Sequence, residues 1–309
     1  MSSIIKVDHL SKKFKETTAV DDLSFSVNEG DVYGFLGQNG AGKSTTIRML
    51  LSLVAPTGGE INIFGKKLST HRSEILQRIG AVIEKPDLYK YLSAYDNLSI
   101  FARMSRMKVT RQLLMKQLEM VGLEDRVNSK VRTFSQGMKQ RLGIAVALVH
   151  DPALIILDEP TNGLDPQGIA DMRNLILRLS REMGKTVLIS SHLLSEIELI
   201  ANRMIVIHKG KKMAEGNVAD LLDPAHSLIQ IETTDDKATK EIIKKTKWAI
   251  FLQNDKDLRL MMNKEEVPML VNDLVAMGVQ LLSVNPGHSL ENYFLSLTTV
   301  PGYVEPFAN

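Results

Sequence analysis

The spacing of apolar residues changes several times along the chain. Residues 4–36 alternate apolar and polar positions, as half-buried strands do. A helical spacing follows over residues 44–53, and a strand pair is expected at 60–64 and 79–83. The first third of the chain is therefore expected to form short strands around one helix.

The middle of the chain has a helical spacing. From residue 93 to about 149 apolar residues recur every three or four positions, which predicts a helical insert within an α/β frame. Continuous apolar runs return at 153–157 and 187–189, as in buried parallel strands, and a helix at 168–183 separates them. A further strand is expected at 205–207.

Beyond about residue 222 the pattern changes again. It predicts the order β-α-β-β-α-β of a small, ferredoxin-like α+β unit, followed by a last amphipathic helix. The expected elements are 226–233, 236–246, 249–253, 258–262, 264–277, 279–284 and 289–297. We therefore expect two domains, residues 1–222 and 223–309.

Composition agrees with two ordinary globular domains. The chain has 309 residues, of which 44% are hydrophobic and 24% charged, and this excludes wholesale disorder. The 38 basic residues nearly balance the 36 acidic ones, so no general attraction to nucleic acid or anionic lipid is expected. The absence of cysteine excludes disulfides, thiolate catalysis and cysteine metal sites.

The sequence shows no pattern of a secretory signal or a membrane span. The N-terminus lacks a basic region followed by a long apolar core. The most apolar stretch, residues 142–157, is interrupted by His150, Asp151 and Pro152, whereas a spanning helix needs about 18 apolar residues. We therefore expect a soluble chain, whose role at a membrane would need a partner.

A glycine-rich loop carries the first chemical motif. Residues 37–44 read Gly-Gln-Asn-Gly-Ala-Gly-Lys-Ser, which fits G-x4-G-K-[ST] between an expected strand and an expected helix. In such a loop backbone N–H groups surround the β-phosphate, Lys43 reaches the β- and γ-phosphates, and the Ser44 hydroxyl ligates Mg²⁺. The alternative is a glycine-rich turn that fits by accident, in about one chain in a hundred of this composition.

Two adjacent carboxylates end an apolar run. Residues 155–157 lead into Asp158 and Glu159, which would face opposite sides unless the strand has already ended. In a P-loop enzyme the strand-end aspartate holds the hydration shell of Mg²⁺, and the next glutamate polarises the attacking water. The alternative, an acidic cap for the next helix, fits less well beside the glycine-rich loop.

The order of the motifs resembles a known family. Ser135, Gln136 and Gly137 precede an apolar helix that leads through Asp151-Pro152 into the acidic strand, although Ser135 would also suit a plain helix start. Together these motifs resemble the ATPase subunit of ATP-binding cassette (ABC) transporters over about residues 4–220. The resemblance implies an α/β P-loop NTPase fold with an antiparallel β subdomain and a helical insert at about 87–150, with the small C-terminal α+β domain added.

The resemblance also implies the site residues. Phe14 would stack on adenine, Glu159 and His192 would act on the attacking water, and Ser135 and Gly137 would meet the γ-phosphate of ATP on a second copy. Alone, Phe14 would fit a core aromatic and His192 a capping or buried histidine. The implied nucleotide-binding residues are Phe14, Gly37, Asn39, Gly40, Ala41, Gly42, Lys43, Ser44, Thr45, Ser135 and Gly137. The implied catalytic residues are Lys43, Glu159 and His192, and the implied Mg²⁺ ligands are Ser44, Glu84 and Asp158.

Two positions depart from the common family pattern. The signature loop reads Phe-Ser-Gln-Gly-Met where Leu-Ser-Gly-Gly-Gln is usual, which retains Ser135 and Gly137. Glu84 stands where most members have glutamine. A glutamate there, the trailing ferredoxin-like segment and the helix at 289–294 are similar to the subgroup that exports, or protects its host against, bacitracin and lantibiotic peptides.

The resemblance finally implies partners and a location. Two ATP-binding subunits, as a homodimer, would act with separate integral membrane permease subunits at the cytoplasmic face of the membrane, with no nucleic acid. Residues 84–95 would contact the permease. The alternatives are a soluble cassette ATPase of DNA repair or translation, an exporter of an unrelated substrate, and a regulatory module with little turnover. A repair protein would carry a long coiled-coil insertion and a translation protein a second P-loop, and the sequence has neither.

Overall fold

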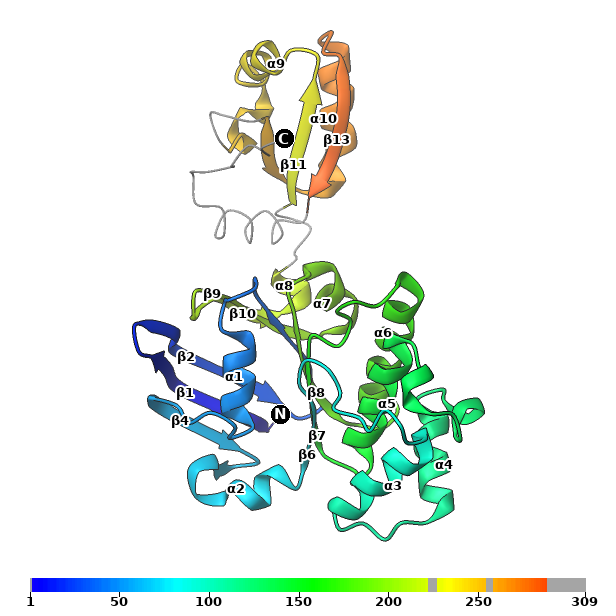
Figure 1. Cartoon of the computed structure of the whole chain (residues 1–309). Helices are drawn as coiled ribbons and strands as arrows, with labels where there is room; N and C mark the ends of the chain where they lie inside the picture. Colours follow the sequence, from blue (N-terminus) through cyan, green and yellow to red (C-terminus); the bar gives the residue numbers. More distant parts are fainter. Residues whose placement is uncertain (1, 222–226, 254–257, 288–309) are drawn as a thin grey trace, which may run out of the picture. The chain divides into compact units, whose positions relative to one another are not determined.

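The chain divides into two compact units, Met1–Asn217 and Val218–Asn309. The computed structural model in Figure 1 describes residues 2–221, 227–253 and 258–287. Within these residues no helix is long and apolar enough to cross a membrane. That the two units are independent domains divided near residue 222 stays a prediction.

A six-stranded sheet forms the centre of the first unit. Its order is β10-β9-β3-β8-β7-β6, and every pairing is parallel except that of β10 with β9. All residues of β3, β7 and β8 are buried, as expected for parallel strands that helices cover on both faces. The strands are β3 Val32–Leu36, β6 Ile79–Val82, β7 Leu154–Asp158, β8 Thr186–Ser191, β9 Arg203–His208 and β10 Lys211–Asn217.

A second, antiparallel sheet of the same unit has the order β2-β1-β4-β5. Its strands are β1 Ser3–Phe14, β2 Thr17–Asn28, β4 Gly58–Ile63 and β5 Lys66–Lys67. The expected pairing of 60–64 with 79–83 is wrong, because β4 pairs with β1 whereas β6 joins the other sheet. The alternating β4 buries only Ile61 and Ile63, whereas the continuous apolar run of β6 suits a strand beside the fully buried β7.

Helices flank the parallel strands. Figure 1 shows α1 and α5 on either side of β6–β8. The helices are α1 Lys43–Leu50, α2 Leu68–Leu76, α3 Ala94–Met104, α4 Arg111–Met120, α5 Gln136–Leu148, α6 Pro166–Arg181 and α7 Leu194–Ile200, with 3₁₀ turns at Glu124–Arg126 and Val131–Thr133. The expected helical insert corresponds to α3–α5, whose N-caps Ser93, Thr110 and Ser135 each accept a backbone N–H. The short elements α2, α7 and β10 were not expected.

The second unit contains a three-stranded antiparallel sheet in the order β12-β11-β13. Its elements are α8 Val218–Leu221, β11 Ser227–Thr233, α9 Asp236–Ile243, β12 Arg259–Met262, α10 Val267–Ala276 and β13 Leu281–Gly287, with 3₁₀ turns at Lys247–Phe251 and Lys264–Glu266. The prediction of a ferredoxin-like order with four strands is therefore wrong in one element. The expected helix at 289–297 lies outside the described residues.

The missing strand is the apolar segment expected at 249–253. Residues 249–251 belong to the 3₁₀ turn Lys247–Phe251, which Thr246 caps by accepting the N–H of Trp248. What remains of the expected strand is an isolated antiparallel bridge between Leu252 and Leu260. A period of three brings Trp248 and Phe251 together, with ring centroids 6.1 Å apart, and leaves Ile250 80% exposed. Because Trp248 Nε1 also donates to Asp273 of α10, the buried indole fixes the turn. A strand would have turned Trp248 and Ile250 to the same face.

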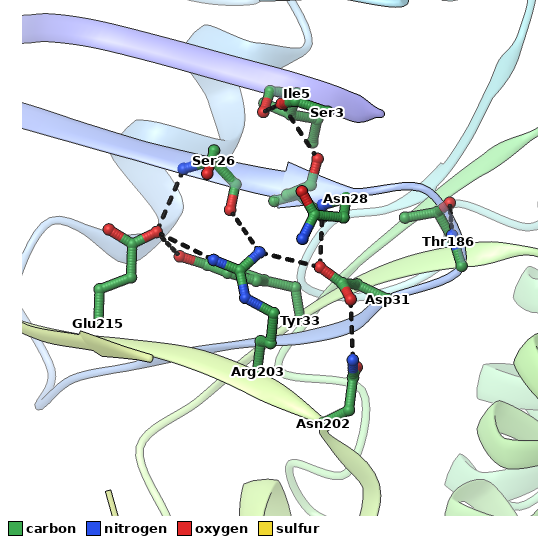
Figure 2. Close-up of polar contacts among 12 residues, drawn as sticks. Ser3, Ile5, Ser26, Asn28, Asp31, Tyr33, Thr186, Asn202, Arg203 and Glu215 are labelled. Carbon is green, nitrogen blue, oxygen red and sulfur yellow. Dashed lines mark hydrogen bonds and ion pairs between the residues drawn. The ribbon is translucent and has the colours of Figure 1, made fainter. Parts of the chain in front are cut away.

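A buried polar cluster joins β2 to the six-stranded sheet. Figure 2 shows Arg203 between Asp31, 3.1 Å away, and Glu215, 3.9 Å away. Arg203 also donates to the carbonyl of Ser26, and Glu215 accepts both the Ser26 N–H and the Tyr33 hydroxyl. Buried charges are stable only when paired and hydrogen-bonded. The cluster therefore binds the two sheets of the first unit to each other.

Tyr33 makes the stability of this cluster depend on pH. Its burial, with Glu215 beside it, raises the pKa of Tyr33 well above the ordinary value of 10.0. The folded state thus keeps the proton above pH 10, where the unfolded state loses it, and the stabilisation is present below that pH and lost above it. Above pH 10 the free energy of unfolding of the wild-type protein should fall more steeply with pH than that of Tyr33→Phe, by up to about 1.4 kcal/mol per pH unit. Urea unfolding from pH 9 to 11 measures this, and parallel curves for the two proteins would refute it.

Candidate active site

The loop between β3 and α1 depends on its glycines. Gly40 and Gly42 have φ values of +80° and +107°, which disfavour other residues. A Cβ at Gly42 would lie 2.6 Å from the carbonyl oxygen of Ala19, and one at Gly37 would lie 2.8 Å from that of Ile207. The glycines thus allow the loop to approach neighbouring backbone closely.

Lys43 folds back over this loop from the first turn of α1. Its Nζ donates to the carbonyls of Gly37, at 2.6 Å, and Gln38, at 3.2 Å. Nζ also lies 3.0 Å from Glu159 Oε1, and the Lys43 side chain is only 5% exposed. The first-turn N–H groups of a helix have no acceptors within the helix, so the ammonium and these donors suit an anion.

A cavity of about 320 Å³ borders the loop. Phe14 lines it and is 46% exposed, with Lys12 Nζ 4.8 Å from the ring centroid. Phe14 is therefore no core aromatic, and its ring is open to a planar ligand. The other lining residues are Ala19, Gln38, Asn39, Gly40, Gly42, Lys43, Ser44, Thr45 and Glu159, while Ala41 is buried beneath the loop.

The two carboxylates diverge because β7 ends between them. Asp158 is the last strand residue, and Glu159 turns into the left-handed region with φ +48°. Glu159 Oε2 lies 2.7 Å from Nδ1 of His192, which therefore donates, since an ionised carboxylate only accepts. Lys43 and His192 thus hold the two oxygens of Glu159.

Asp158 presents an unused oxygen. It is 1% exposed, and its Oδ1 accepts a hydrogen bond of 2.6 Å from Ser190. Among the described residues nothing donates to its Oδ2, although that atom is buried. A buried carboxylate oxygen without a donor is costly, so it suits a cation or its hydration water.

A larger cavity of about 870 Å³ contains the side-chain oxygens that could bind a metal ion. It is lined by Asn39, Ser44, Ile83, Glu84, Lys85, Gln136, Asp158, Glu159, Asn162 and Gly163. The described residues contain no cluster of three acidic or histidine side chains for a metal ion. Mg²⁺ commonly uses one or two carboxylates together with substrate phosphates, so Ser44, Asp158 and Glu84 fit it in that way. Glu84, with φ +56°, meanwhile pairs with Arg48 of α1.

The signature loop lies apart from the P-loop. Ser135 caps α5 by accepting the N–H of Met138 at 3.2 Å. Ser135 and Gly137 line a separate cavity of about 360 Å³ beside Leu164 and Asp165. The two cavities share Gln136 and Gly163, but Ser135 and Gly137 line only the smaller one. One chain therefore brings together Lys43 with the acidic pair and His192, but not with Ser135 and Gly137.

Sequence reasoning missed the polar side chains that hold the site. Ser190 bonds the acidic pair, and Arg48 pairs with Glu84. Ser191 and Thr161 both donate to Glu196 Oε2 at 2.7 Å, which ties β8 to the turn after Glu159. The available signal was the pair of serines that ends a fully buried strand directly after three apolar residues.

Comparison with known proteins agrees with this geometry. The model of the family described as ABC transporter matches residues 20–162. The bacitracin transport ATP-binding protein BcrA of Bacillus licheniformis is 41% identical over 301 residues, covering 96% of this chain and 98% of that protein. The lantibiotic transport ATP-binding protein SrtF of Streptococcus pyogenes is 42% identical over 212 residues, covering 69% of this chain and 90% of that protein.

Solved structures share the fold. The dimeric, post-hydrolysis structure of the ATP-binding cassette MJ0796 bound to ADP and Pi matches with a TM-score of 0.63 and 28% identity. The match covers 69% of this chain and 98% of that one. The expected P-loop NTPase fold is thereby confirmed.

The two loop glycines provide a test of the loop geometry. Gly40→Ala meets no atom within 4 Å and adds only the strain of a positive φ, about 1–2 kcal/mol. Gly42→Ala also forces its Cβ against the Ala19 carbonyl, which adds at least about 1 kcal/mol. We expect calorimetry to show a melting temperature at least about 2 °C lower for Gly42→Ala than for Gly40→Ala. Equal melting temperatures would contradict this loop conformation.

Proposed function

Because this chain belongs to the ABC transporter family, we propose that its ATPase activity drives export of, or self-protection against, a peptide antibiotic of the bacitracin or lantibiotic type. The chain is an ATPase of that family. The observation that carries the cargo proposal is the near full-length similarity to BcrA. Glu84 in place of the common glutamine supports it. The names of the relatives favour transport over DNA repair or translation.

ATP binds along the P-loop. Its phosphates accept hydrogen bonds from the loop N–H groups, and Lys43 exchanges its ion pair with Glu159 for one with the phosphates. Adenine stacks on the exposed face of Phe14. Within residues 37–45, all but Gly37 and Ala41 line the cavity that we propose for the phosphates. Ser44, Asp158 and Glu84 would hold Mg²⁺, which would supply positive charge against the phosphates.

Glu159 and His192 direct the attacking water. Once Lys43 has moved to the phosphates, Glu159 Oε1 is free to accept a hydrogen bond from water, and Oε2 keeps the bond from His192 Nδ1. The carboxylate thereby orients and polarises the water toward the γ-phosphate.

Two copies complete the site. Cassettes of this family dimerise and act with membrane permease components. The separate position of Ser135 and Gly137 supports a homodimer in which each signature loop meets the γ-phosphate on the other copy. Tyr89 and Tyr91, which are 51% and 79% exposed, support a permease contact at residues 84–95. We therefore propose that the chain acts at the cytoplasmic face of the membrane. Its formal charge of +2 gives no reason to expect a nucleic-acid partner.

Removing the charge of Glu159 separates binding from turnover. We expect Glu159→Gln to bind ATP as wild type does, to lose about 10²–10⁴-fold in steady-state hydrolysis, and to accumulate an ATP-bound dimer. Coupled-enzyme ATPase assays and gel filtration with ATP measure this. As a control, Lys43→Ala weakens ATP binding itself by about 10-fold or more. Undiminished hydrolysis by Glu159→Gln would refute the role of Glu159.

Replacing Glu84 tests its part in coupling. Glutamine keeps an oxygen for Mg²⁺ but loses the charge and the ion pair with Arg48. We expect Glu84→Gln to keep basal hydrolysis within about tenfold, or roughly 1.4 kcal/mol, and to lower peptide resistance in cells. Resistance equal to wild type would show that Glu84 has no special role in coupling.

A further inference from the structure

Ser190 makes two hydrogen bonds to the acidic pair from inside the six-stranded sheet. It is fully buried near the end of β8. Its Oγ accepts the backbone N–H of Glu159 at 2.9 Å and lies 2.6 Å from Asp158 Oδ1. Because an N–H can only donate, the single hydroxyl hydrogen is left for Asp158, and both bonds have a fixed direction.

We propose that Ser190 is a positioning residue for ATP hydrolysis, whose one hydroxyl sets the metal-facing oxygen of Asp158 and the backbone turn of Glu159. This inference rests on the proposed function of the site. Both effects follow from where Ser190 stands in the sheet, directly opposite Asp158 in the parallel ladder of β7 and β8.

The bond to Glu159 replaces a ladder bond. In a continuing parallel strand the N–H after Asp158 would meet a backbone carbonyl of β8. Glu159 instead has φ +48°, and the Ser190 hydroxyl accepts that N–H. A strained backbone persists only when its surroundings hold it, and here that support lets the carboxylate reach Lys43 and His192.

The hydrogen bond from Ser190 makes the two oxygens of Asp158 different. Oδ1 is occupied by Ser190, so the carboxylate cannot rotate freely and Oδ2 stays without a donor among the described residues. Asp158 lines the cavity that also holds Ser44 and Glu84. Ser190 therefore keeps Oδ2 available for Mg²⁺ or its hydration water, in the way that hydrogen-bonded outer residues orient metal ligands.

Thr186 supplies a matched control on the same strand. It is 1% exposed, and its hydroxyl accepts a backbone N–H, that of Gly30, at 2.9 Å. Thr186 stands at the first position of β8, and its hydroxyl touches neither Asp158 nor Glu159. Thr186→Val therefore removes a comparable buried acceptor without changing the acidic pair.

The test compares nucleotide binding with and without Mg²⁺ in the full-length protein. A fluorescent ATP analogue is titrated into wild type, Ser190→Ala and Thr186→Val, in Mg²⁺ and in EDTA, and turnover is measured separately. In EDTA we expect the affinity of Ser190→Ala for the analogue to lie within about twofold of that of wild type. The gain in affinity that Mg²⁺ gives should be about tenfold smaller than in wild type, and kcat should be about 10–100-fold lower. Thr186→Val should lower the melting temperature alone.

Contrary outcomes are distinct. Equal losses with and without Mg²⁺, or an unchanged kcat, would show that Ser190 is only structural. If Ser190→Ala does not fold, Ser190→Cys, whose slightly larger thiol is a weaker donor and acceptor, must show the same split between Mg²⁺ and EDTA. Absence of ATP hydrolysis by the wild-type protein would instead overturn the proposed function.

Discussion

The ion pair between Lys43 and Glu159 is the interaction on which the site depends. Both side chains are nearly buried, at 5% and 17% exposed, so neither charge is stable there without a partner. The pair links the P-loop to the end of β7, and His192 extends it to the end of β8. In the proposed mechanism a triphosphate, with several negative charges, competes with Glu159 for Lys43. That exchange of partners would leave Glu159 Oε1 free to accept a hydrogen bond from water.

The rest of the fold serves to hold these groups. The carboxyl ends of β3, β7 and β8 lie at one edge of the parallel sheet, and the segments that follow them carry Lys43, at the start of α1, Glu159 and His192. The cluster around Arg203 binds the antiparallel sheet, with Phe14 at the end of β1, to the strands that carry those loops. The signature loop is the exception, because it begins α5 and lines another cavity. This separation is the structural basis of the proposed two-copy site.

Local sequence was enough to locate the chemical motifs. It was not enough to locate the side chains that hold those motifs in place. Residues 37–44 and Asp158-Glu159 could be found because their chemistry requires particular residues at adjacent positions. The role of Ser190 depends on its register opposite Asp158, and the Arg203 cluster joins residues more than 170 apart in the chain. The error at 249–253 has the same origin, since an apolar run fits a strand or a turn until Trp248 finds its place against α10. The alternating pattern of β4 indicates a half-buried strand, but it does not identify β1 as the strand beside it.

ATP turnover per subunit, measured with the purified chain over a wide range of protein concentration, tests most directly whether one chain carries an incomplete hydrolysis site. If a second copy must supply Ser135 and Gly137, turnover per subunit rises with concentration and then saturates as dimers form. Turnover per subunit that stays constant from nanomolar to micromolar protein, with a monomer present throughout, would contradict the two-copy site.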